Sequence, residues 1–143
     1  NSKPLAEKRG INISINKKDH KYKNYSSAIE FVITNEDGKK IYVVGTIGMN
    51  NEERIVSIKN HDVDMAISDN MIYLGNEDVP GVIGAVGATL GKENINIATM
   101  NVGRRENSAI MLLTVDSEVG RRALKVLREL SQIKWAHYLD LTI

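Results

Sequence analysis

The hydrophobic positions of residues 71–143 predict six elements in the order strand, helix, strand, strand, helix, strand. Residues 71–74 form a short apolar run typical of a buried strand, which Gly75 and the polar residues 76–78 end. Apolar residues recur at helical spacing over 82–90, which predicts a helix with Pro80 in its first turn and Asp78 or Val79 at its cap. This order is that of the ferredoxin-like βαββαβ unit, whose helices cover one face of the sheet.

The other elements of this half follow from similar patterns. Glu93 and Asn94 close the first helix, and residues 95–101 then alternate as a strand. Residues 108–115 are almost continuously apolar, which indicates a central strand, and Ser117 suits the cap of a second helix. That helix carries an apolar stripe of Val119, Ala123, Val126, Leu127 and Leu130, and residues 134–143 alternate as a last strand.

Residues 1–69 predict a mainly β region. Residues 4–9 suit a short helix, and Ile11, Ile13 and Ile15 alternate with polar residues as in a half-buried strand. A hairpin is expected from 28–34 and 39–47 around a turn at 36–38, and a second pair from 54–58 and 63–67 around 60–62. The chain is therefore predicted to be an α+β protein with domains at 1–69 and 70–143.

Two features of the second domain predict close contacts. Gly84, Ala88 and Gly91 leave one helix face almost without side chains, which indicates that another element packs tightly against it. The glycine run Gly81-x-x-Gly84-x-x-Gly87 does not have the G-x-G-x-x-G spacing of a dinucleotide fingerprint, so packing is the better explanation. The sheet face opposite the helices also needs a cover, for which we expect a second copy of the chain.

Composition excludes several classes of function. The 143 residues include 19 basic and 18 acidic side chains, a net charge of +1 that predicts neither a nucleic-acid nor a membrane partner. The chain has no cysteine, which excludes disulfides and thiolate metal sites and is compatible with a reducing cytoplasm, the location we expect. His20, His61 and His137 are far apart in sequence, so we expect no metal site, and no catalytic arrangement is evident.

The polar residues Asn76, Asp78 and Asn96 have two interpretations. Helix capping and turn chemistry explain Asn and Asp at such positions without any ligand. Alternatively, the start of a helix favours a carboxylate, and Asp78 offers a negative charge to an ammonium group. Together these groups would suit a zwitterionic amino acid.

The same stretch resembles a known family. The run Asn-x-Asp-x-Pro-Gly-Val-Ile at 76–83, followed at 91–104 by Gly-Lys-Glu-Asn-Ile-Asn-Ile-Ala-Thr-Met-Asn-Val-Gly-Arg, is similar to the opening of an ACT domain, a small amino-acid-sensing module. It most resembles the ACT domain of long-form D-3-phosphoglycerate dehydrogenases, which open serine synthesis. Leu-Ala-Glu-x-Arg-Gly-Ile at 5–11 and residues 54–64 resemble the intervening, or allosteric substrate binding, domain of those enzymes.

The resemblance implies a regulatory fragment that binds L-serine, or another small amino acid, between ACT domains of a homo-oligomer and mediates feedback inhibition. The chain itself would then catalyse nothing, and NAD would belong to the catalytic domains of the full-length enzyme. Many family members have histidine where this chain has Asn76, although an amide N–H also donates to a carboxylate. The implied effector-binding residues are Asn76, Asp78, Val79, Pro80, Gly81, Asn96 and Ile97.

The resemblance also implies a role for the intervening domain. It would bind an anionic effector such as the phosphorylated substrate, with Arg54 and Lys39 or Lys40 facing the phosphate. The alternative is that these residues are solvated surface charges.

Two other functions remain open at this point. The chain also resembles the β chain of a bacterial iron–sulfur L-serine dehydratase, which would need a cysteine-bearing partner for its cluster. A free-standing ACT sensor is the third interpretation. Because the chain begins at Asn1, we expect it to be a piece of a longer protein.

Overall fold

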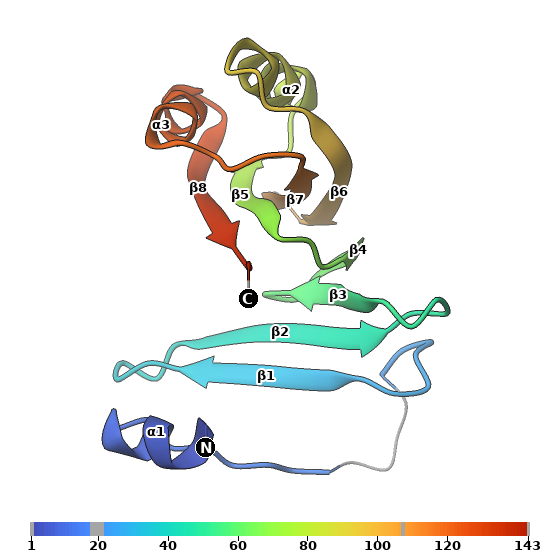
Figure 1. The fold of residues 1–143 in the computed structure, drawn as a ribbon, viewed down its shortest axis with the longest axis vertical. Coiled ribbons are helices and arrows are strands. Elements are labelled where there is room, and N and C mark those ends of the chain that lie inside the picture. Colours follow the sequence, from blue (N-terminus) through green and yellow to red (C-terminus); the bar gives the residue numbers. More distant parts are fainter. Residues whose placement is uncertain (1, 18–21, 107, 143) are drawn as a thin grey trace.

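The computed structural model describes residues 2–17, 22–106 and 108–142 of the chain. Within these residues the chain forms three helices and eight strands, and the strands make two antiparallel four-stranded sheets (Figure 1). The predicted α+β class is therefore confirmed. A mainly β part comes first, and a βαββαβ part follows it.

The first sheet is a simple meander. Helix α1 (Ser2–Lys8) precedes it, and its strands follow in the order β1 (Ile29–Thr34), β2 (Lys40–Ile47), β3 (Glu53–Ile58) and β4 (His61–Ala66). The helix and the hairpin around Asp37 and Gly38 agree with the sequence predictions. Residues Lys59 and Asn60 form the turn between β3 and β4 with φ angles of 49° and 63°, as a tight primed hairpin turn requires.

Two predictions for this region are wrong. Residues 11–15 form no strand, and Ile15 is 82% exposed. The alternating pattern was a poor guide because a strand also needs a neighbouring backbone to pair with, and residues 11–15 pair with none of the described strands. His61, expected in a turn, instead begins β4 and is buried.

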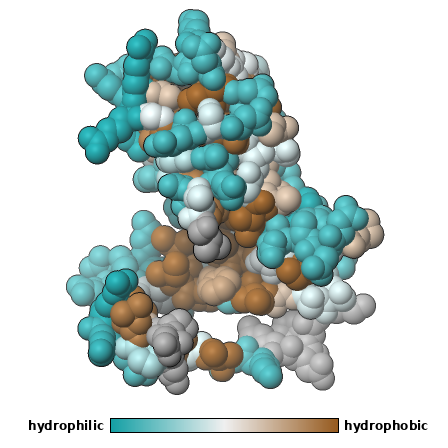
Figure 2. All heavy atoms as spheres, in the orientation of Figure 1, coloured by the Kyte–Doolittle hydropathy of each residue, from teal (hydrophilic) through white to brown (hydrophobic). Residues whose placement is uncertain are grey.

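Strand β1 leaves an apolar surface on the first sheet. All its residues are exposed, and Ile29, Phe31 and Ile33, which point to one side of the strand, are about 60% exposed, at 64%, 59% and 61%. Figure 2 shows hydrophobic surface gathered in the lower half of the molecule, in the region of β1 and β2. This sheet is therefore much less covered than the second one.

The second sheet has the predicted ferredoxin-like connectivity. Its elements are β5 (Asn70–Glu77), α2 (Val82–Lys92), β6 (Ile97–Arg105), β7 (Ser108–Val115), α3 (Arg121–Glu129) and β8 (Ile133–Asp140), with the strand order β6-β7-β5-β8. Figure 1 shows both helices on the same side of this sheet. The core between the helices and the sheet includes the fully buried side chains of Ile72, Leu74, Val86, Leu90, Leu113 and Leu127.

Three element boundaries differ from the prediction. Strand β5 continues through Gly75 to Glu77, because Asn76 and Glu77 still pair with Ala109 and Ser108 of β7. Helix α2 begins at Val82 with Gly81 as its N-cap, so neither Asp78 nor Val79 caps it. Helix α3 begins at Arg121 rather than after Ser117, since Val119 is buried in the core while the chain is still non-helical.

The expected close packing against the glycines of α2 is not found within the described chain. A Cβ atom added at Gly84, Gly87 or Gly91 would meet no atom within 4 Å. These glycines therefore face open space, and the contact that would explain them is not one that the described residues make.

The sheet face opposite the helices is covered from within the chain rather than by a second copy. Residues Ile58, Val63 and Met65 of β3 and β4 pack against Met71, Ile110 and Leu112 of the second sheet. We call this contact the seam. Because the hairpin β3–β4 already covers this face, a second copy would have to associate elsewhere.

The backbones approach closely at one point of the seam. A Cβ atom at Gly103 of β6 would lie 2.7 Å from the carbonyl oxygen of Asp62 and 3.1 Å from the Cβ atom of His61. The imidazole Nε2 of His61 lies 3.2 Å from the hydroxyl of Ser108, which adds a polar contact across the seam. Glycine is thus required at 103 for space.

We expect Gly103→Ala to lower the free energy of unfolding by about 1–3 kcal/mol, because the added methyl group must push β4 away from the sheet. Urea denaturation measures this change. The matched control is Gly120→Ala, just before α3, where the added methyl group meets no atom within 4 Å and should lower stability less than Gly103→Ala does. Equal stabilities for the two variants would contradict the tight seam.

Tyr73 packs against the residues of the seam and gives it a pH dependence. Burial raises the pKa of its hydroxyl to about 12, compared with about 10 in an unfolded chain. Between these values the unfolded state has lost the proton and the native state has kept it, so stability falls as the pH rises from 10 to 12. Denaturation series at increasing pH should show a shallower fall for Tyr73→Phe, and an equally steep fall would contradict this assignment.

Candidate functional site

The candidate site lies where β5 ends and α2 begins. The loop between them, residues 78–81, includes Pro80, whose ring fixes φ, and Gly81, whose φ of +89° is a conformation that other residues rarely adopt. These two residues turn the chain sharply from the sheet into the helix. The turn leaves Asp78 beside the end of β6.

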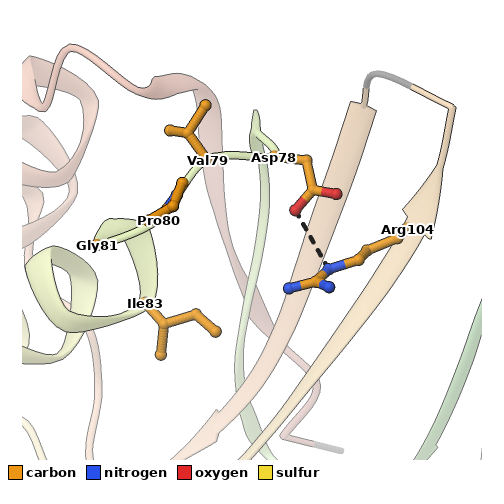
Figure 3. A pocket seen from close by; sticks show the side chains of 6 residues that line it. All are labelled: Asp78, Val79, Pro80, Gly81, Ile83 and Arg104. Atoms are coloured by element: carbon orange, nitrogen blue, oxygen red, sulfur yellow. Dashed lines mark ion pairs between the residues drawn. The ribbon is translucent and has the colours of Figure 1, made fainter.

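A pocket of about 340 Å³ opens at this junction (Figure 3). This volume is within the range of about 300–1,000 Å³ typical of small-molecule sites. The structure brings four of the sequence-predicted effector residues together here, with two others that sequence analysis did not select. The lining residues are Asp78, Val79, Pro80, Gly81, Ile83 and Arg104.

The pocket holds a pair of opposite charges. The Nε atom of Arg104 lies 3.2 Å from Oδ1 of Asp78, with side chains 66% and 32% exposed. Ion pairs as exposed as this one contribute about 0–1 kcal/mol, so a ligand can replace the contact at little cost. The site thus offers one negative and one positive group to a small molecule.

Arg104 was not among the residues that sequence analysis selected. The topology contained the missing signal. Strands β5 and β6 both run antiparallel to β7, so they are parallel to each other. Their C-terminal ends therefore lie at the same end of the sheet. Arg104, near the end of β6, therefore lies close to Asp78, which follows β5.

Asn76 lies outside the pocket. Its side chain is buried within the second sheet, with the residue only 2% exposed, and Nδ2 donates a hydrogen bond of 2.6 Å to the carbonyl oxygen of Glu77. One N–H group of the amide predicted to hold a carboxylate is therefore engaged with the backbone, while its buried Oδ1 has no hydrogen-bond partner among the described residues.

Asn96 and Ile97 lie at the other end of β6. Because a strand rises about 3.3 Å per residue, Asn96 is about 25 Å along the strand from Arg104. The side chain of Asn96 donates to a carboxylate oxygen of Asp116 at 2.5 Å. Within one chain the structure does not bring Asn96 to Asp78.

The predicted anion-binding residues are also separated. Lys40 pairs with Thr34 at one end of β2, and Arg54 pairs with Thr46 near the other end. The Arg54 guanidinium donates to Asp64 at 2.7 Å and to Glu52 at 3.0 Å, and the hydrogen bond to Asp64 raises the pKa of Arg54. Its charge is thus already balanced by two carboxylates.

The glycine run of α2 does not fit a dinucleotide. Gly81 caps the helix, and Gly84 and Gly87 lie inside it, whereas a dinucleotide fingerprint places its glycines in the turn directly after a strand. No group of three or more metal-ligating side chains occurs among residues 2–17, 22–106 and 108–142. His20 lies outside the described residues. No described helix is long and apolar enough to cross a membrane.

Comparison with known proteins identifies relatives of both halves. Residues 70–132 match the family described as ACT domain. The chain is 38% identical to a D-3-phosphoglycerate dehydrogenase from Archaeoglobus fulgidus over 144 aligned positions, which cover 98% of the chain and 27% of the relative.

Two further dehydrogenases match over a similar extent. A D-3-phosphoglycerate dehydrogenase from Bacillus subtilis is 34% identical over 99% of the chain, and one from Methanocaldococcus jannaschii is 32% identical over 94%. The alignments cover 27% and 25% of these relatives. The chain thus spans about a quarter of the length of the dehydrogenases it matches.

Proposed function

We propose that this chain, which belongs with the C-terminal ACT-containing regions of D-3-phosphoglycerate dehydrogenases, senses a small amino acid on behalf of the enzyme of which it is part. L-Serine, the end product of the route that such enzymes open, is the effector we propose. Oxidation of phosphoglycerate with NAD would take place in parts of the protein outside this chain.

The observation that carries the proposal is the pair of opposite charges in the pocket beside α2. An amino acid presents an ammonium and a carboxylate group, and the pocket presents Asp78 and Arg104. The positive end of the helix dipole also favours a carboxylate near the start of α2. Val79 and Ile83 provide apolar walls for a small side chain.

The separation of Asp78 from Asn96 supports a site built from two chains. Strand β6 is at the edge of its sheet, and an edge strand exposes backbone groups that a second strand can pair with. If two copies of β6 paired antiparallel about Asn101, the start of each strand would meet the end of the other. Asn96 of a second copy would then lie near Asp78 and Arg104.

Helix α2 suits the same association. Its glycine-lined face is open, and Ile83 on the pocket side is 48% exposed. A second copy approaching along β6 would cover this face and provide the close contact that the glycines predict. This contact leaves the seam undisturbed.

Regulation would follow from a difference in affinity. An effector that bridges two ACT domains favours the arrangement of the enzyme in which those domains are correctly paired. Inhibition results if that arrangement is the less active one. The relatives that match most of the chain are dehydrogenases, which supports this function over the dehydratase β chain.

Calorimetric titration of the intact protein with L-serine tests the proposal. We expect saturable heat in the wild type and an affinity about tenfold to hundredfold lower in Asp78→Asn, because the ammonium group loses its charged partner. Asp37→Asn, in the distant β1–β2 turn, is the matched control and should bind normally. No heat at millimolar serine from a folded protein, or unchanged affinity in Asp78→Asn, would contradict the proposal.

A further inference from the structure

Among the residues that the structure describes, Arg104 is the one basic side chain that lines the pocket described above. It extends from β6 toward the loop that carries Asp78, and Figure 3 shows its guanidinium group facing that carboxylate. The neighbouring Arg105 does not line the pocket. Arg104 is therefore placed to meet whatever binds to Asp78.

Asn76 is poorly placed for the same task. Its Nδ2 group already donates to the carbonyl oxygen of Glu77, and the residue is buried beneath the surface of the sheet. Its second N–H group remains, but Asn76 does not line the pocket, so its amide would have to leave a buried site to reach a ligand there. The carboxylate of an amino acid would thus need another donor from this chain.

We propose that Arg104 binds the α-carboxylate of the effector while Asp78 binds its ammonium group. This inference rests on the proposed function and identifies the group that selects the ligand. The ligand would insert into an existing ion pair, so that each charge of the protein exchanges one partner for another and neither is left unpaired.

The chemistry of the guanidinium group suits this exchange. Nε of Arg104 faces Asp78, and the two terminal nitrogens carry further N–H groups that can bind a carboxylate through two parallel hydrogen bonds. Such a group recognises a planar carboxylate better than a point charge does. The pocket would then reject amines that lack a carboxylate, even when their side chains match.

The inference also predicts that the effector is small. With the ligand held between Asp78 and Arg104, its side chain would lie toward Val79 and Ile83, which line the same pocket. Both are apolar and partly exposed, at 44% and 48%. A small aliphatic or hydroxymethyl group can contact them and still leave room for a second chain beside the pocket.

Calorimetry with L-serine and ethanolamine, which is serine without its carboxylate, tests the role of Arg104. We expect Arg104→Gln to weaken L-serine binding at least about tenfold, since hydrogen bonds to charged groups contribute this much. Ethanolamine should bind weakly to the wild type and equally weakly to the variant. Arg104→Lys should give an intermediate loss for L-serine, because it keeps the charge but not the paired donors.

Arg105→Gln is the matched control, since it removes the same charge from the neighbouring exposed position and should bind L-serine as the wild type does. Circular dichroism confirms that each variant is folded. Unchanged or tighter serine binding in Arg104→Gln overturns this inference alone, as does an equal loss for serine and ethanolamine. A wild type that binds no small amino acid overturns the proposed function as well.

Discussion

The seam between the two sheets is the contact on which the remaining arrangement depends. Apolar side chains from β3 and β4 cover the face of the second sheet that its helices leave free. An ACT-type sheet without this cover would expose a continuous apolar surface and could associate face to face with a copy of itself. In this chain the seam already covers that face, whereas the edge strand β6 and the face of α2 that carries its glycines are still open.

Because association is expected along β6, the proposed site would be built from residues of two chains. The pocket and Asn96 lie at opposite ends of β6, and a rigid strand cannot bring them together within one chain. Antiparallel pairing of two such strands brings both ends together twice, which gives two equivalent sites related by a two-fold axis. In the proposed function a ligand held there would touch both chains, and through this shared contact a small amino acid would influence how the domains of a larger enzyme are arranged.

Sequence periodicity was sufficient for the elements whose burial is one-sided. The βαββαβ order, the apolar strand β7 and the core stripe of α3 all follow from it. It was misleading where tertiary pairing decides the outcome, as at Ile13, which pairs with no described strand. Asp78 was identified by its motif, whereas Arg104 joins it only because β5 and β6 end at the same edge of the sheet. The cover of the free sheet face was equally hidden, since nothing local distinguishes a hairpin of the same chain from a second copy.

Mixing two impaired variants tests most directly whether one site needs two chains. Asp78→Asn and Asn96→Ala each impair both sites of a homodimer, whereas a mixed dimer carries one intact site and one doubly impaired site. After subunit exchange in an equimolar mixture, L-serine should bind with wild-type affinity at about a quarter of all sites, as random two-fold pairing requires. Recovery of no site after complete exchange, or wild-type affinity in the Asn96→Ala protein alone, would contradict a site shared between chains.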